Sequence, residues 1–193
     1  MMRGQNIKLL ITDFDGTLVK TFRANYLAYQ KAFNECGLSL TEEAYYKCFG
    51  YRFERFMEVM EIKNKTIVDS IREKKARFYH EFFSELQLNE PLYGFIKSFK
   101  CSGGKTAIAS TARRKNLTNA LEYLHLLESF DLILGGEDVN EGKPSPEIYL
   151  NVLKHFECEP QNALVFEDSF VGIEAAQRAG VNYVAINSHF YGN

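Results

Sequence analysis

The chain has 193 residues, and its 46% hydrophobic content is enough to bury a full core in one domain with an insertion or in two small domains. Its 23 basic and 25 acidic residues leave a formal net charge of -2. This balance argues against nucleic acid as a partner, and it means that local charges must attract any anionic substrate.

The spacing of the cysteines and the hydropathy of the chain indicate the cellular compartment in which the protein is expected. The four cysteines are scattered without a C-x-x-C pair, which argues against a disulfide scaffold and favours a reducing environment (Cys36, Cys48, Cys101 and Cys158). The first residues, Met1 to Asn6, are polar, and no secretory signal or bilayer-length apolar run follows. We therefore expect a cytoplasmic protein that has no membrane partner.

The chain opens with a predicted strand at Ile7–Ile11, a short apolar run that ends in Asp13-Phe-Asp-Gly-Thr17. Similar runs recur further along (Thr106–Ala109, Leu132–Leu134, Ala163–Phe166 and Tyr183–Ile186). Helical patterns lie between the later runs. One begins at Ser145, with Ser145 as the N-cap and Pro146 in the first turn, and another runs from Ser169 to a C-terminal cap at Gly180. The alternation predicts an α/β fold, a Rossmann-like parallel sheet with helices on both faces.

Residues 19–88 differ from the rest because they contain helical patterns and no strand-like run (Ala24–Cys36, Thr41–Cys48, Arg52–Met60 and Thr66–Ser84). We therefore predict a small inserted α-helical domain at residues 19–88. Residues 1–18 and 89–193 would together form the α/β core domain.

Asp13 and Asp15 follow the first predicted strand. Side chains at i and i+2 of an extended segment point the same way, so both carboxylates can address one ligand. Gly16 would permit a tight turn, and two close negative charges need a cation or a shared proton. The alternative is an ordinary turn with two solvated aspartates.

Glu167 and Asp168 end another predicted strand. In an open parallel sheet, ligands bind beyond the carboxyl ends of the strands, so these carboxylates could stand beside Asp13 and Asp15. Such oxygen donors suit magnesium. The simpler alternative is that they cap the following helix.

Ser110, Thr111 and Lys143 are the remaining candidates in this half of the chain. Ser110 and Thr111 close the strand Thr106–Ala109 and offer hydroxyls and amides to a phosphate, although either could cap the next helix. Lys143 follows the strand Leu132–Leu134 between Gly142 and Pro144, which favours a side chain held in place. A solvated loop lysine is the alternative.

Taken in this order, the motifs resemble the haloacid dehalogenase superfamily of phosphohydrolases (Asp13–Leu18, Ile108–Thr111, Gly142–Glu147, Val165–Ser169, Gly172–Ala176 and Ala179-Gly180). The inserted helices are similar to the small helical cap of the subgroup that includes phosphoglycolate phosphatase and β-phosphoglucomutase.

The resemblance implies a role for each residue. Asp13 would be the nucleophile that forms an aspartyl-phosphate, and Asp15 the general acid and base. Mg²⁺ would be held by Asp13, Asp168, the backbone carbonyl of Asp15 and also Glu167. Ser110 and Lys143 would bind the phosphoryl group, with Thr111 beside them. These roles suit phosphoryl transfer, which depends on positioning and charge neutralisation.

The resemblance predicts a magnesium-dependent phosphatase of a small phosphorylated metabolite. Two alternatives stay open: a sugar phosphomutase and a catalytically idle interaction protein on the same fold. Mutase-like relatives carry a histidine near the start of the first cap helix, where this chain has Asn25. Arg52 follows a predicted cap helix and could contact the substrate away from its phosphate, or it could be solvated.

Overall fold

The computed structural model describes residues 6–187, so the polar residues 1–5 and the last residues, 188–193, lie outside this description. The chain forms two compact units. We call Met1–Lys20 with Gln87–Asn193 the core unit, and Thr21–Leu86 the inserted unit. The sequence placed the boundaries of the insertion at residues 19 and 88, two residues from these divisions.

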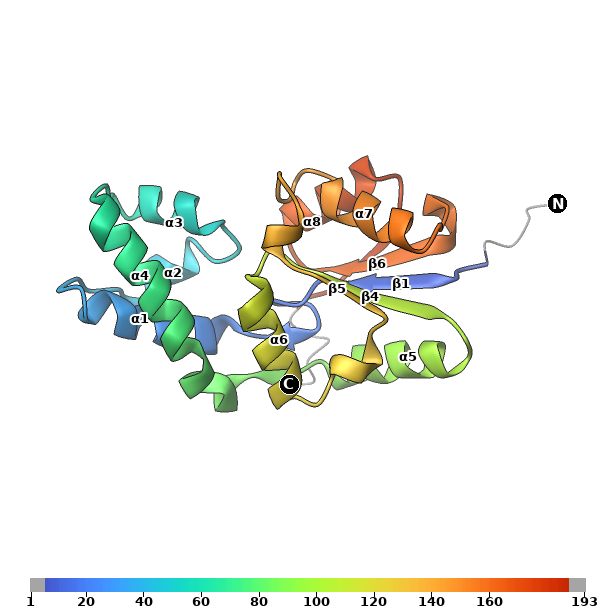
Figure 1. Cartoon of the computed structure of the whole chain (residues 1–193), viewed down its shortest axis with the longest axis horizontal. Helices are drawn as coiled ribbons and strands as arrows, with labels where there is room; N and C mark the ends of the chain where they lie inside the picture. The colour runs from blue at the N-terminus through green and yellow to red at the C-terminus, as the bar shows by residue number, and fades with distance from the viewer. Residues whose placement is uncertain (1–5, 188–193) are drawn as a thin grey trace. The chain divides into compact units, whose positions relative to one another are not determined.

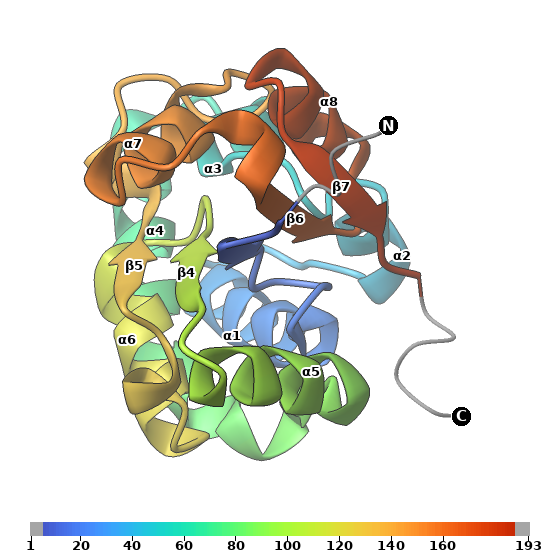
Figure 2. The same cartoon turned by 90° about the vertical axis from the view of Figure 1, so that its right-hand side faces the viewer.

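A five-stranded parallel sheet organises the core unit, with strand order β5-β4-β1-β6-β7 (Figure 2). Its strands lie close to the predicted runs (β1, Leu9–Thr12; β4, Lys105–Ala109; β5, Leu132–Leu134; β6, Ala163–Glu167; β7, Asn182–Ala185). All four residues of the central β1 are buried, as expected for a strand covered on both faces. The predicted α/β fold class is confirmed.

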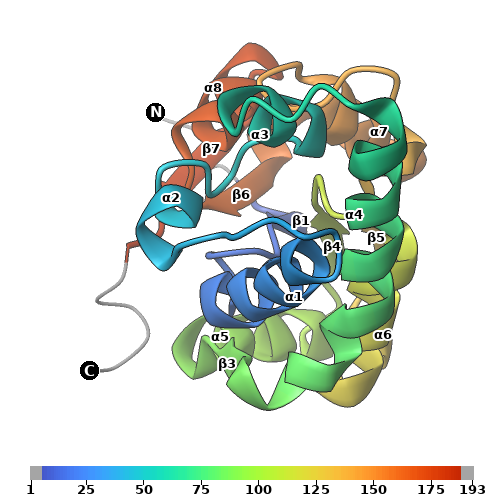
Figure 3. The same ribbon diagram turned by 90° about the vertical axis from the view of Figure 1, so that its left-hand side faces the viewer.

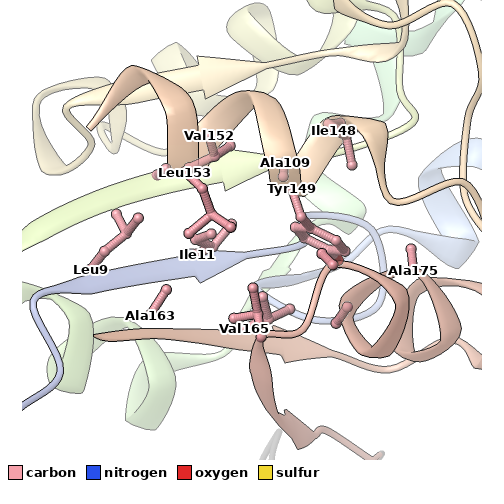
Figure 4. Packing of buried hydrophobic residues seen from close by; sticks show 14 residues of the cluster. Leu9, Ile11, Ala109, Ile148, Tyr149, Val152, Leu153, Ala163, Val165 and Ala175 are labelled. Atoms are coloured by element: carbon pink, nitrogen blue, oxygen red, sulfur yellow. The ribbon is translucent and has the colours of Figure 1, made fainter. Parts of the chain in front are cut away.

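Helices cover both faces of this sheet (Figure 1). One face carries α5 (Glu90–Cys101) and α6 (Arg114–Tyr123), and the other carries α7 (Glu147–His155) and α8 (Phe170–Arg178). Short 3-10 turns complete the connections (Leu127–Ser129, Gly136–Asp138 and Pro160–Asn162). Figure 4 shows Tyr149 and Leu153 of α7 pointing toward Ile11 and Val165 of the sheet, within one buried cluster. Burying each such side chain stabilises the fold by about 2 kcal/mol.

Two predicted helix ends can be compared with the structure. Ser169 is the N-cap of α8 and accepts a hydrogen bond from the Gly172 amide, and Gly180 has the predicted left-handed backbone, with φ of +72°. The predicted N-cap Ser145 is wrong by one residue, because α7 begins at Glu147 with Pro146 as its N-cap. Ser145 still accepts a bond from the Glu147 amide at 3.4 Å, so its hydroxyl serves the first turn from one position further out.

The inserted unit is helical (Figure 3). Its helices follow the predicted ranges (α1, Phe22–Asn34; α2, Glu42–Tyr46; α3, Phe53–Val59; α4, Lys65–Phe78; and the 3-10 helix η1, Tyr79–Glu85). Helix α1 packs against α4 and η1, and aromatic side chains fill much of the core, including Phe33, Tyr45 and Phe56.

One prediction for residues 19–88 is wrong. A strand-free segment was expected, but Val19–Lys20 (β2) and Gln87–Leu88 (β3) pair as short antiparallel strands. They belong to the core unit, where the chain leaves for the insertion and returns from it. Two residues are too few to produce a recognisable alternation of apolar and polar positions. Between residues 6 and 187, the structure contains no helix with both the length and the apolarity required to cross a bilayer.

Candidate active site

Residues that follow β1 and β6 meet at the carboxyl edge of the parallel sheet. Thr12, the last residue of β1, lies opposite Ile108 of β4 and Phe166 of β6. The Asp13 amide then donates to the Phe166 carbonyl at 3.0 Å. Asp13 is therefore held between the ends of two neighbouring strands, although about 150 residues separate it from Glu167 in sequence.

Three carboxylates converge at this edge. Asp13, Glu167 and Asp168 each offer an oxygen atom, and these atoms lie within 4.8 Å of one another. Three negative charges face the single ammonium of Lys143, so the cluster is short of positive charge. An all-oxygen donor set with excess negative charge fits a hard divalent cation such as Mg²⁺.

Lys143 is buried among these groups, with only 8% of its surface exposed. Its Nζ donates to Asp13 Oδ1 at 2.7 Å, to the Ala109 carbonyl at 3.0 Å and to Glu167 Oε1 at 2.5 Å. An ammonium has three N–H groups, so these acceptors match its whole donor capacity. The side chain is thus held against Asp13 rather than solvated.

Asp15 and Gly16 form the tight turn after β1. The Gly16 amide donates to the Val19 carbonyl at 2.8 Å, and Gly16 has φ of +91°, a conformation that favours glycine. A Cβ atom at Gly16 would lie 2.1 Å from Asp168 Oδ2. The glycine therefore lets the turn approach Asp168 closely. Asp15 itself is half-buried at this turn.

The environment shifts the proton affinities of the cluster. Burial raises the pKa of Asp13 well above its usual range, against the opposing effect of the Lys143 ammonium. Burial also disfavours the charged form of Lys143, but Asp13, Tyr149 and Glu167 together outweigh this effect and raise the pKa of Lys143 well above its usual value. Burial raises the pKa of Asp168 to about 6, although its hydrogen bond with Thr17 works in the other direction. A bound cation would relieve this strain on the ionised carboxylates.

Glu167 is fully buried, and hydrogen bonds reach both of its oxygens. Oε1 accepts from Lys143 and from the Tyr149 hydroxyl, and Oε2 accepts from the amide and the hydroxyl of Ser169, each at 3.0 Å. Gly172 allows α8 to approach, because a Cβ there would lie 1.7 Å from Glu167 Oε1. Glu167 therefore ties β6 to α7, α8 and the Lys143 loop.

The other predicted site residues lie in different surroundings. Ser110 is buried directly after β4, and its hydroxyl accepts from the Ala112 amide at 3.0 Å. Thr111 is exposed. Arg52 belongs to the inserted unit, where it is exposed and forms the N-cap of α3 without a side-chain cap bond. The phosphate-binding role of Ser110 and the substrate contacts of Thr111 and Arg52 stay predictions.

Sequence reasoning assigned no role to two residues that contact the site. Thr17 donates its hydroxyl to Asp168 Oδ1 at 2.8 Å, and its place within the Asp13–Leu18 motif was the available signal. Tyr149 lies within the helix predicted to begin at Ser145, and the sequence gives it no role there. A tyrosine at a core position gives no indication in sequence of what its hydroxyl contacts.

Comparisons with known proteins extend over both units. A family model described as haloacid dehalogenase-like hydrolase matches residues 10–186. A phosphorylated carbohydrates phosphatase of Thermotoga maritima is 31% identical over 184 residues, which cover 92% of this chain and 84% of that protein.

Two solved structures are also similar. CbbY of Rhodobacter sphaeroides, in complex with phosphate, has a TM-score of 0.85 at 26% identity and covers 97% of this chain and 89% of its own. A Thermotoga maritima protein provisionally named β-phosphoglucomutase has a TM-score of 0.74 at 30% identity, covering 94% of this chain and 87% of its own. The similarity therefore includes the insertion as well as the sheet.

Proposed function

The chain belongs to the haloacid dehalogenase-like hydrolase family, and from this premise we propose that it is a magnesium-dependent phosphatase of a small phosphorylated metabolite. The observation that carries the proposal is the contact between Lys143 Nζ and Asp13 Oδ1 inside a cluster of three carboxylates. Such a cluster would supply a nucleophile, a fixed positive charge and oxygen donors for a cation at one edge of the sheet. The similarity to a phosphatase of phosphorylated carbohydrates supports the same activity.

In the proposed first step, a carboxylate oxygen of Asp13 attacks the phosphorus atom of the ester. The bond between phosphorus and the leaving oxygen breaks, and Asp15 gives that oxygen a proton. The products of this step are the free alcohol and a phosphoryl group bound covalently to Asp13. Lys143, held beside Asp13, offsets the negative charge of the phosphoryl oxygens.

In the second step, Asp15 takes a proton from a water molecule that attacks the phosphorus atom. The bond between Asp13 and phosphorus breaks, inorganic phosphate leaves, and both aspartates return to their starting states. Ser110, buried at the end of β4, would hold a phosphoryl oxygen through both steps.

The residues that would hold Mg²⁺ are Asp13 and Asp168 through their side chains and Asp15 through its backbone carbonyl, with Glu167 as a further carboxylate of the cluster. When bound, the ion supplies positive charge that neutralises the transferring group and aligns it with the nucleophile. Thr17 and Gly16 support this site indirectly. Thr17 holds the Asp168 carboxylate by a hydrogen bond, and Gly16 leaves space for that carboxylate because it has no Cβ.

Phosphate release from p-nitrophenyl phosphate and from a panel of phosphorylated sugars, nucleotides and short acids tests the proposal. We expect turnover with Mg²⁺ and none in excess EDTA. Unchanged activity in EDTA would contradict the metal site. The absence of turnover on the whole panel would instead favour an interaction protein on the same fold.

A sugar phosphomutase is the second candidate, because one of the similar structures is provisionally named β-phosphoglucomutase. It would use the same Asp13 chemistry but return the phosphoryl group to the sugar rather than to water. Product analysis separates the two activities.

A further inference from the structure

In the part of the chain that the structure describes, three hydrogen-bond acceptors and one aromatic ring surround the ammonium of Lys143. The acceptors are Asp13 Oδ1, the Ala109 carbonyl and Glu167 Oε1. The ring is that of Tyr149, whose centroid lies 5.2 Å from Nζ. One nucleophile and three scaffold groups thus define where the positive charge sits.

Tyr149 is fully buried, and it contacts this arrangement twice. Its ring lies within cation–π distance of the ammonium, and its hydroxyl donates to Glu167 Oε1 at 3.2 Å. Burial raises the pKa of this hydroxyl well above its ordinary value, so the group keeps its proton and remains a donor. The helix that carries Tyr149 is anchored in the apolar core through Ile148, Val152 and Leu153.

We propose that Tyr149 is a positioning residue for catalysis: its hydroxyl fixes Glu167 Oε1, and Glu167 in turn fixes the Lys143 ammonium beside the nucleophile. This inference rests on the proposed function, because it assigns Lys143 to the phosphoryl group that Asp13 receives. In this role Tyr149 acts through Glu167 and Lys143 rather than on the phosphoryl group itself.

The chain of contacts explains why the hydroxyl matters. Glu167 Oε2 is held by Ser169 at the start of α8, so Oε1 is the oxygen that faces Lys143. The Tyr149 hydroxyl is the second donor to Oε1, and it comes from helix α7 rather than from a loop. Without that donor the Glu167 carboxylate can rotate, and the ammonium that follows it loses its fixed position.

The test is Tyr149→Phe, which keeps the ring and its packing but removes the hydroxyl. We expect kcat to fall about tenfold, which corresponds to losing one hydrogen bond to a charged group, while KM changes by less than about twofold. Tyr93→Phe is the matched control. Its hydroxyl lies 3.0 Å from Ser129 Oγ, in a part-buried bond outside the site, so its loss should leave kcat unchanged.

A spectroscopic measurement follows the Lys143 ammonium directly and does not depend on turnover. In ¹H–¹⁵N spectra of the lysine side chains, the signal that disappears in Lys143→Arg identifies Lys143. We expect Tyr149→Phe to shift this signal and to speed its exchange with water, and we expect Tyr93→Phe to leave it unchanged.

Together the two measurements decide the inference. A changed signal with a lower kcat supports it, whereas a change in only one of them, or in neither, overturns it as a positioning role. If wild-type protein hydrolyses no phosphate ester, the proposed function fails. In that case the Lys143 signal alone decides the inference. An unchanged signal in Tyr149→Phe would overturn it, and a shifted signal would support the link from Tyr149 through Glu167 to Lys143.

Discussion

At the residue scale, Asp13 combines burial with a position directly against a lysine. It is 6% exposed, and burial raises the pKa of its carboxyl group. We predict that Asp13→Asn retains the fold, because asparagine is nearly isosteric and removes a carboxylate that burial disfavours. An amide oxygen cannot serve as the nucleophile, so kcat should fall by at least about 10³-fold.

Phosphate release, measured alongside the melting temperature, checks this prediction. The matched control is Asp69→Asn, an equivalent change at an exposed position of α4, which should leave kcat and melting temperature unaltered. A variant that kept a tenth of the wild-type kcat at Asp13 would remove this residue from the nucleophile role.

Asp168 makes metal binding depend on pH. Its folded-state pKa of about 6 exceeds the ordinary value of 3.8, so the metal-free protein takes up a proton on folding between these pH values. The contribution of Asp168 to the stability of the metal-free protein is therefore most favourable below pH 4, and it declines as the pH rises through about 6. Mg²⁺ requires the ionised carboxylate and must displace that proton.

We therefore predict that the apparent Mg²⁺ affinity weakens about tenfold per pH unit as the pH falls below 6, and that it levels off above that value. Isothermal titration calorimetry between pH 5 and 7.5 measures it. Asp168→Asn should bind Mg²⁺ more weakly at every pH, with a shallower dependence near pH 6. An affinity independent of pH in the wild-type protein would contradict the assignment of Asp168 as a ligand.

At the element scale, α8 approaches β6 closely because Gly172 has no side chain. We predict that Gly172→Ala is destabilising and lowers kcat, since its Cβ would lie 1.7 Å from Glu167 Oε1 and displace the carboxylate that holds Lys143. Gly94→Ala in α5 is the matched control. Nothing lies within 4 Å of its Cβ position, so alanine should stabilise that helix by about 0.5–1 kcal/mol.

Chemical denaturation and kcat, measured for both variants, test this contrast. Opposite signs of the change in unfolding free energy are expected, with a loss of kcat confined to Gly172→Ala. Equal effects of the two substitutions would show that the close approach at α8 has no bearing on the site.

The elements also show which parts of the fold and site were readable from sequence. The apolar runs that precede Asp13, Ser110 and Asp168 were recognisable as strands, because a strand buried on both faces appears in sequence as a nearly continuous hydrophobic run. The convergence of Asp13 and Asp168 then followed from the geometry of a parallel sheet. The two-residue strands at Val19 and Gln87 were not readable, since pairing rather than local pattern creates them.

Contacts between side chains in the site could not be predicted from the sequence. Nothing in the helical pattern around Tyr149 distinguishes a hydroxyl that contacts Glu167 from one that is merely accommodated. The same holds for Gly172, whose need for a missing Cβ depends on how closely α8 packs on Glu167. Such roles depend on tertiary distances that a single sequence does not contain.

At the scale of the whole molecule, the fate of the phosphoryl group decides between the two candidate activities. A mutase must keep its aspartyl-phosphate from water until the sugar has turned around, so Asp15 must not activate water in the meantime. The resemblance to mutase-like proteins implies a histidine near the start of the first cap helix, whereas α1 has the buried Asn25 there. Asparagine has no group that titrates near neutral pH, so it cannot supply that control.

We therefore predict that a sugar 1-phosphate, if accepted with Mg²⁺, yields inorganic phosphate as the main product. Phosphorus NMR measures the products, with a trace of the sugar bisphosphate present to start any mutase cycle. Asn25→His introduces the histidine expected in a mutase, and it should lower the fraction of the phosphoryl group that is released as inorganic phosphate. Accumulation of the 6-phosphate isomer by the wild-type protein, with little free phosphate, would replace the phosphatase with a mutase while leaving Asp13 as the group that receives the phosphoryl.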